Sequence, residues 1–274
     1  MENDIKYKLA VVQMDCVIGE IAPNVQKIEK FAQVASDRGV DLVVFPECAT
    51  TGYFIADDLA RLAEPSDGPT DLALGKIAAS AGVHLAVGTV VAENGGYYDS
   101  QVLFAPTGER LSTYHKVHLF SAERGTFQAG DTPTVVDTGL GRVGMTICYD
   151  MIFGDYFRCL ADKGAEIIIN STDWIGDGYQ RQTWGWSGVT TQGMAATRAL
   201  ENGVFVAMSN RVGHEMGFDS LGHSCIASPS GQILASIPAG EDIAIADINI
   251  KAEDLDKWRA IATYRQDRRP EVYA

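Results

Sequence analysis

Short runs of β-branched and other apolar residues recur along the chain, and several are separated by segments with helical periodicity. The runs lie at residues 8–13, 41–45, 83–91, 143–147, 166–170, 204–209 and 243–248. Residues 24–36 follow Pro23 and place apolar side chains on one helical stripe, so we predict a helix that covers a sheet face. This alternation of strands and helices predicts a layered α/β domain.

Two pairs of apolar runs are separated only by short turns that contain glycine, which is typical of β-hairpins. The pairs are residues 83–91 with 97–106 and residues 223–229 with 232–237. Some neighbouring strands must therefore be antiparallel, and mixed strands with helices outside suit two sheets packed face to face. Neither a fixed-period repeat nor a low-complexity linker divides the sequence, so we expect a single domain over residues 1–274.

The charge of the chain excludes two classes of partner. The formal net charge is −14, from 22 basic and 36 acidic residues, and no Lys- or Arg-rich stripe offsets it. Phosphate backbones and anionic lipids would be repelled, so we expect neither nucleic acid nor a membrane as partner. No apolar run approaches the roughly 18 residues of a membrane span, and residues 1–6 lack a secretory signal pattern. We therefore expect a cytoplasmic protein.

Three reactive side chains stand at or near the ends of extended segments. Cys148 directly follows the apolar run 143–147, where a strand-to-helix junction would display a nucleophile, and Glu47 closes the run that begins at Asp41. Lys116 lies in the extended stretch 114–120. Nucleophilic catalysis by a side chain needs a nucleophile, a proton carrier and a donor aimed at the atom that gains charge. A thiol, a carboxylate and an amine supply one each.

The four other cysteines carry no comparable signal. They are widely scattered and form no CxxC pair, so the sequence predicts neither a zinc site nor a redox couple. We expect them to be reduced core residues: Cys16, Cys48, Cys159 and Cys225.

The motifs Phe45-Pro-Glu47, Tyr114-His-Lys116-Val-His-Leu and Ile147-Cys148-Tyr-Asp150 resemble, in order and spacing, the three catalytic motifs of the nitrilase superfamily of carbon–nitrogen hydrolases. Supporting segments are also similar to that family: Thr51-Gly-Tyr53, residues 164–170, Ala199-Leu-Glu-Asn202 and Ser209-Asn210. The resemblance spans about the whole chain. It implies a four-layer αββα sandwich of two mixed sheets with outer helices, and protomers that pair into a homodimer or higher homo-oligomer.

The three motifs suit one mechanism. We expect Cys148 to attack the carbonyl carbon and form a thioester, while Glu47 carries the thiol proton to the departing ammonia and later activates water. Lys116 would stabilise the oxyanion, and the backbone N–H of Tyr149 is a natural second donor. By resemblance, Glu123 is the second carboxylate, which positions Lys116 and the substrate.

Aromatic residues near the expected strand ends are candidates for the substrate pocket. Tyr53 and Trp174 are the preferred ones, and Trp184 and Trp186 are weaker candidates. The tail at residues 251–274 is rich in charged and aromatic residues, more than a solvated end needs. We expect this tail to pack on a partner subunit.

The sequence offers no site for a cofactor. Residues 139–144 match the letters of GxGxxG, but they precede an expected strand and do not open a helix. His115 and His118 flank Lys116 without clustered thiols or carboxylates, which makes a poor zinc site, and we expect both to be structural. We therefore expect no metal, nucleotide or organic cofactor.

The residues after the nucleophile indicate the branch of the family. Cys148-Tyr-Asp150 resembles the amidases, whereas nitrilases more often show Cys-Trp-Glu. Relatives that act on ω-amides of keto-dicarboxylic acids tend to carry an arginine where this chain has Ile152. We therefore expect hydrolysis of a small primary carboxamide to acid and ammonia. The alternatives are an N-carbamoyl amine or amino-acid hydrolase, an aliphatic nitrilase, and a non-catalytic interaction protein on the same fold.

Overall fold

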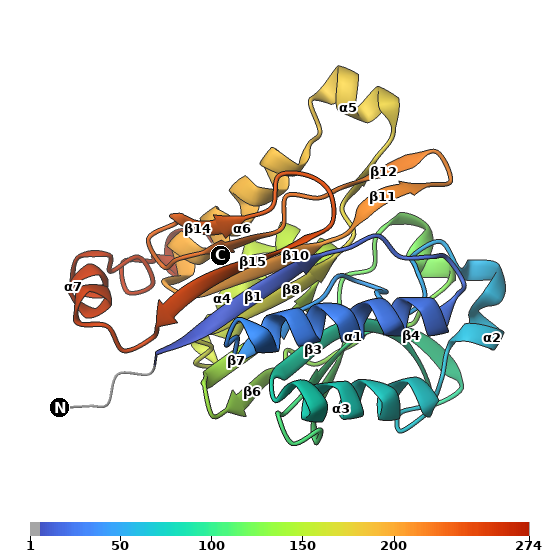
Figure 1. The fold of residues 1–274 in the computed structure, drawn as a ribbon. Helices are drawn as coiled ribbons and strands as arrows, with labels where there is room; N and C mark the ends of the chain where they lie inside the picture. The colour runs from blue at the N-terminus through green and yellow to red at the C-terminus, as the bar shows by residue number, and fades with distance from the viewer. Residues whose placement is uncertain (1–5, 274) are drawn as a thin grey trace.

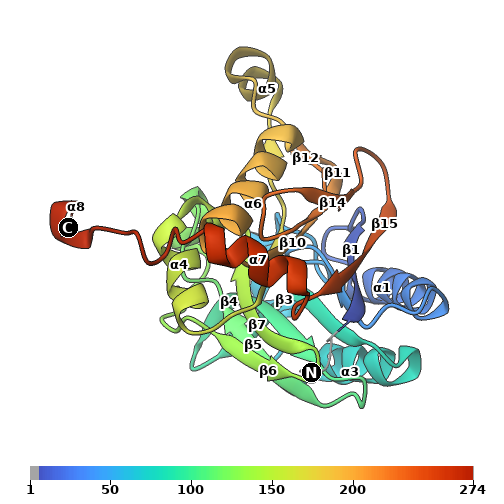
Figure 2. The same cartoon turned by 90° about the vertical axis from the view of Figure 1, so that its left-hand side faces the viewer.

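A computed structural model describes residues 6–273 and confirms the αββα sandwich (Figure 1). Within these residues, two mixed six-stranded sheets pack face to face. Helices α1 (Ile21–Asp37) and α3 (Pro69–Ala81) cover the outer face of the first sheet. Helices α4 (Gly154–Asp162) and α6 (Gly188–Asn202) cover the outer face of the second, as Figure 2 shows.

The remaining elements complete the two sheets and their connections. The first sheet has the order β15 (Asp242–Asn249), β1 (Lys6–Gln13), β2 (Leu42–Val44), β3 (His84–Glu93), β4 (Gly96–Phe104) and β5 (Arg110–His115). The second has the order β14 (Ile233–Ser236), β13 (Cys225–Ala227), β10 (Phe205–Asn210), β8 (Ile167–Thr172), β7 (Gly141–Ile147) and β6 (Val135–Thr138). A small sheet contains β11 (Val212–Glu215), β12 (Phe218–Leu221) and β9 (Ile175–Gly176). The other helices are α2 (Leu59–Leu62), α5 (Gly178–Trp184), α7 (Glu253–Ile261) and α8 (Pro270–Tyr273), with 3₁₀ turns η1 (Ala56–Asp58), η2 (Ser121–Gly125) and η3 (Cys148–Ile152).

The side-chain alternation of β2 shows how the first sheet separates two cores. Leu42 and Val44 are fully buried among residues of the second sheet such as Met145. Val43 points the other way and packs with Ile28 of α1. Successive residues of a strand face opposite sides, so a run of apolar residues without polar interruption is what a strand buried on both faces requires.

The predicted strands and both hairpins are observed. β3 and β4 pair antiparallel, as do β13 and β14. The helix predicted at residues 24–36 begins earlier, at Ile21, so Pro23 lies in its first turn, where the missing N–H has no intrahelical partner to lose. One expectation is wrong: β5 ends at His115, and Lys116 lies in the loop that follows instead of in an extended stretch.

The topology brings several strand ends to one edge of the sandwich. β1, β2 and β3 are parallel in the first sheet, and β7, β8 and β10 are parallel in the second. Carboxyl ends of parallel strands share an edge, which is where α/β folds place ligands.

Within residues 6–273 no helix has the length and apolarity needed to cross a membrane.

Candidate active site

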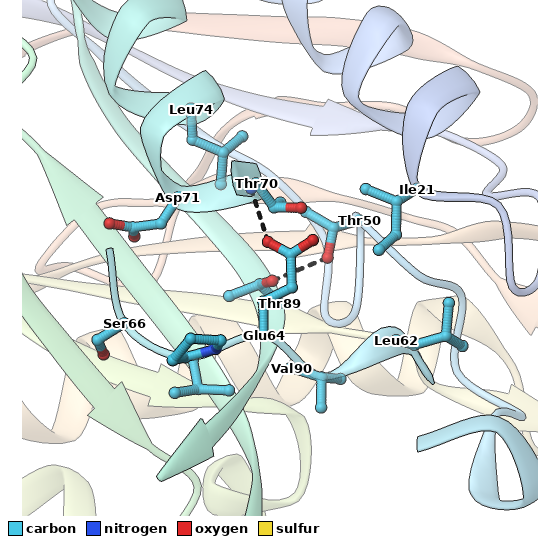
Figure 3. A pocket seen from close by; sticks show the side chains of 12 residues that line it. Ile21, Thr50, Leu62, Glu64, Ser66, Thr70, Asp71, Leu74, Thr89 and Val90 are labelled. Carbon is cyan, nitrogen blue, oxygen red and sulfur yellow. Dashed lines mark hydrogen bonds between the residues drawn. The ribbon is translucent and has the colours of Figure 1, made fainter. Parts of the chain in front are cut away.

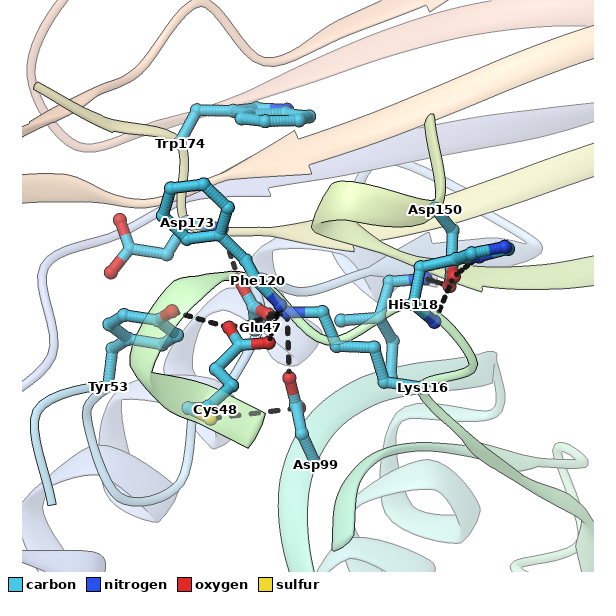
Figure 4. A network of polar contacts seen from close by, with 12 residues as sticks. Glu47, Cys48, Tyr53, Asp99, Lys116, His118, Phe120, Asp150, Asp173 and Trp174 are labelled. Carbon is cyan, nitrogen blue, oxygen red and sulfur yellow. Dashed lines mark hydrogen bonds and ion pairs between the residues drawn. The ribbon is translucent and has the colours of Figure 1, made fainter. Parts of the chain in front are cut away.

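Three of the predicted catalytic side chains meet in one buried cluster, in which Figure 4 shows Glu47 beside Lys116. The Lys116 Nζ lies 2.5 Å from Glu47 Oε1 and 2.8 Å from Glu123 Oε1. The side chains of Glu47 and Lys116 are fully buried, and Glu123 is 5% exposed. A buried charge is tolerated only when it is paired, so these groups must be held as one ionic cluster.

Cys148 stands at the sharp bend where β7 gives way to η3. Its φ of 41° is left-handed, a conformation that costs a non-glycine residue roughly 1–3 kcal/mol and is concentrated at functional sites. The side chain is 6% exposed and lines a cavity. Burial raises the pKa of the Cys148 thiol well above its ordinary value, the Glu47 carboxylate raises it further, and the Lys116 ammonium opposes them. The resting group is therefore a thiol with a base and a cation nearby.

A buried carboxylate holds the bend at Cys148 against the loop that carries Lys116. Asp150 accepts hydrogen bonds from the backbone N–H of Ile147 at 2.9 Å and from the hydroxyl of Tyr114 at 2.7 Å. It also accepts the backbone N–H of His118 at 3.0 Å and lies 2.7 Å from the His118 ring. His118 thus has the structural role expected for it. His115 lies elsewhere, against Ser100 and Tyr98.

Sequence reasoning missed a third carboxylate at Lys116. Asp99 of β4 is fully buried, and its Oδ2 lies 3.2 Å from Lys116 Nζ. The carboxylate oxygens of Glu47, Asp99 and Glu123 lie within 4.8 Å of one another, a grouping that could hold a metal ion. Here the Lys116 ammonium is salt-bridged to all three and supplies the positive charge that a metal would otherwise bring.

The cluster has more negative than positive groups, and this shifts its pKa values. Burial raises the pKa of Glu47 well above its ordinary value; Lys116 opposes the shift, while Asp99 and Glu123 add to it. The pKa of Lys116 is raised because the carboxylates outweigh the effect of burial. Like charges in one dry site cannot all ionise, so Glu47 retains a proton to higher pH than an exposed glutamate.

Above this cluster lies a cavity of about 290 Å³ that opens at Cys148. All three predicted substrate-binding residues, Tyr53, Tyr149 and Trp174, line it. The Tyr53 hydroxyl also donates to Glu123 Oε1, so it connects the cavity wall to the ionic cluster. Trp184 and Trp186 line the cavity too, together with residues that sequence reasoning did not select: Phe120, Ile152, Asp173, Ile175 and Gln180.

Asp173 anchors the cavity wall to a second buried network. Its backbone N–H donates to Glu47 Oε2 at 2.8 Å, and its carboxylate lies 3.4 Å from Arg211. Arg211 is 2% exposed and also pairs with Asp15 at 3.0 Å and with Glu215. Arg211 follows β10 and lies in no sequence motif that would have identified it. By pairing with Asp173, it holds the end of β8, whose backbone N–H at Asp173 in turn positions Glu47.

A second cavity lies beside α3, and its polar lining groups are engaged with the protein (Figure 3). It holds about 20 Å³. The Glu64 carboxylate accepts the backbone N–H of Thr70 at 2.7 Å, and the hydroxyls of Thr50 and Thr89 lie 2.8 Å apart. The two hydroxyls satisfy each other, and the Glu64 carboxylate holds the start of α3.

Comparison with known proteins agrees with this geometry. The sequence profile of the carbon-nitrogen hydrolase family matches residues 8–260. A nitrilase of Pyrococcus abyssi is 32% identical over 271 residues, which cover 97% of this chain and 98% of that protein. An (R)-stereoselective amidase of Pseudomonas sp. is 34% identical over 266 residues, which cover 96% of this chain and 91% of that protein. The crystal structure of an amidase from Nesterenkonia sp. superposes with a TM-score of 0.82 at 25% identity, covering 97% of this chain and 95% of that one.

Proposed function

We propose that this chain, which belongs to the carbon-nitrogen hydrolase family of the nitrilase superfamily, hydrolyses small-molecule primary carboxamides through a thioester on Cys148. Its relatives establish an enzyme that acts on carbon–nitrogen bonds. The observation that carries the finer proposal is the buried cluster of Lys116, Glu47 and Glu123 beneath a thiol held at a left-handed strand end. The related Nesterenkonia amidase has been crystallised, as a variant, in complex with butyramide.

The proposed steps use only groups of the site. Glu47 takes the proton of the Cys148 thiol as the sulfur attacks the amide carbon, and the Lys116 ammonium and the Tyr149 N–H stabilise the oxyanion. The same proton passes to the nitrogen, ammonia leaves, and a thioester remains. Glu47 then takes a proton from water, whose oxygen attacks the thioester carbon. The acid departs and the thiol is restored.

The nature of the scissile group is tested by one panel of substrates. We expect a higher kcat/KM for an aliphatic primary amide than for the matching nitrile, because Lys116 and the Tyr149 N–H suit an oxygen anion. A tenfold preference would reflect about 1.4 kcal/mol of transition-state discrimination. Ammonia release is measured for the amide, the nitrile and an N-carbamoyl amine on one enzyme preparation. A higher value for the nitrile would make the chain a nitrilase, and carbon dioxide with ammonia would indicate a ureido substrate.

The raised pKa of Glu47 predicts how activity depends on pH. The free enzyme needs ionised Glu47 to accept the thiol proton, so kcat/KM should rise with pH through a pKa above the ordinary value of 4.5. Asp99→Asn removes one of the negative charges that raise this pKa, and the acid limb should therefore move to lower pH. The control is Asp137→Asn, an exposed residue of β6. An acid limb at the same pH in the Asp99 variant and the wild type would contradict this account.

We also propose a homodimer in which the C-terminal tail packs on the partner subunit. The tail leaves the body after α7, and Figure 2 shows α8 standing away from the sandwich. Two apolar side chains of this region are exposed, Ile261 at 80% and Val272 at 64%, and a partner subunit would cover them. Light scattering on the whole chain should give the mass of a dimer, and removal of residues 262–274 should shift the population toward monomer. A monomeric whole chain would contradict the proposal.

A further inference from the structure

The cavity at Cys148 is larger and more apolar than a short amide needs. Its volume of about 290 Å³ approaches the lower end of typical ligand pockets. Six aromatic side chains line it: Tyr53, Phe120, Tyr149, Trp174, Trp184 and Trp186. We infer, resting on the proposed function, that this site takes primary amides whose acyl group is apolar, uncharged and of arylalkyl size.

The aromatic wall is held in place before any ligand enters. Trp174 and Trp186 pack edge to face with ring centroids 5.8 Å apart, and Phe120 meets Tyr149 at 5.1 Å. The Trp186 indole N–H donates to the Ile175 carbonyl at 2.8 Å, so its polar atom is satisfied by the protein. Fixed rings of this kind offer apolar faces and edges to a flat ligand group at little entropic cost.

The cavity wall offers no cation to an anionic acyl group. Within the part of the chain that the structure describes, no lysine or arginine lines this cavity, and its one acidic lining residue, Asp173, has its carboxylate paired with Arg211. Ile152 also lines the cavity, and this apolar side chain offers no hydrogen-bond donor to a second carboxylate of the substrate. A substrate carboxylate would therefore be desolvated here without a partner.

The outer wall comes from α5, which projects from the body (Figure 1). This helix begins at the side-chain cap of Asp177 and ends at Gly185, whose left-handed φ of 65° stops it. It presents Trp184, which is 67% exposed and packs edge to face with Tyr179 at 5.6 Å. An exposed indole at the mouth of a substrate cavity is well placed to cover the distal end of a long acyl group.

The test compares kcat/KM for acetamide, 3-phenylpropionamide and the monoamide of succinic acid. We expect the arylalkyl amide to exceed acetamide by about 100-fold, the range that extra apolar groups contribute in a hydrophobic pocket. The anionic monoamide should be the poorest of the three. Turnover of acetamide or the monoamide with a kcat/KM equal to or above that of 3-phenylpropionamide would overturn this inference alone. Absence of ammonia from all three amides would overturn the proposed function and this inference with it.

Variants of the cavity mouth test the assignment of Trp184. Trp184→Ala should lower the ratio of kcat/KM for 3-phenylpropionamide to that for acetamide about tenfold, and Trp184→Phe should keep most of that ratio. The matched control is Leu72→Ala, which truncates an exposed apolar side chain of α3 that is not part of the cavity lining. An unchanged ratio in Trp184→Ala would show that the indole does not contact the acyl group and would overturn this part of the inference.

Discussion

Replacing Cys148 by alanine will abolish amide hydrolysis and leave the protein folded. In the proposed mechanism the thiol is the attacking group, so its loss should reduce kcat by at least about 10⁴-fold, the scale seen when a covalent nucleophile is removed. Alanine is nearly as small, and the site is 6% exposed at the edge of the core, so thermal unfolding should change by only a few degrees. Ammonia release and circular dichroism measure the two properties.

The control for this variant is another buried thiol. Cys225→Ala removes a fully buried cysteine of β13 whose pKa burial raises to about 12. This variant should lose some stability and retain turnover. If both cysteine variants were inactive, the loss would be structural; if Cys148→Ala hydrolysed amides at the wild-type rate, the nucleophile would lie elsewhere.

The second large effect is expected at Glu47. Glu47→Gln keeps the shape of the side chain and the contact with Lys116, but it removes the group that accepts and returns the proton. General acid–base catalysis typically contributes about 10²–10⁴-fold, and both formation and hydrolysis of the thioester should slow by this order. Rapid-quench assays that resolve the first turnover from the steady state measure the rates of thioester formation and thioester hydrolysis separately.

The matched control is Glu64→Gln, at a carboxylate that accepts the Thr70 N–H at the start of α3 and lines the second cavity (Figure 3). It should alter stability slightly and leave the rate unchanged. Near wild-type hydrolysis by Glu47→Gln would make Glu47 a structural partner of Lys116, with the base elsewhere.

Local patterns were enough to predict the layered fold. Runs such as residues 204–209 are buried on both faces in the structure, and glycine turns marked both hairpins. Glu47 and Cys148 could be found because Cys148 directly follows the apolar strand β7 and Glu47 comes three residues after the end of β2, so their positions are set by local sequence. The small sheet of β9, β11 and β12 was not predicted, because its strands are short and only partly buried.

The residues that complete the site left no local signal. Asp99 sits within the strand sequence Tyr97-Tyr98-Asp99, where a carboxylate usually indicates a solvent-exposed position. It is buried because pairing between β4 and β5 brings the Lys116 loop beside it. Arg211 and Asp173 meet across 38 residues in sequence, and Asp150 joins His118 across 32. Such contacts depend on how the two sheets align with each other. The periodicity of a single sequence does not specify that alignment.

The central claim is a covalent acyl group on Cys148, and mass spectrometry of a quenched reaction tests it directly. Wild-type protein and Glu47→Gln are mixed with a primary amide, quenched in acid, digested and mapped. We predict an added mass equal to the acyl group on the peptide that contains Cys148. The acylated fraction should be larger in the protein whose thioester hydrolysis is slower relative to its thioester formation. Iodoacetamide should alkylate Cys148 and remove both the adduct and the activity. An acyl group on another residue, or full turnover by protein alkylated at Cys148, would contradict the account.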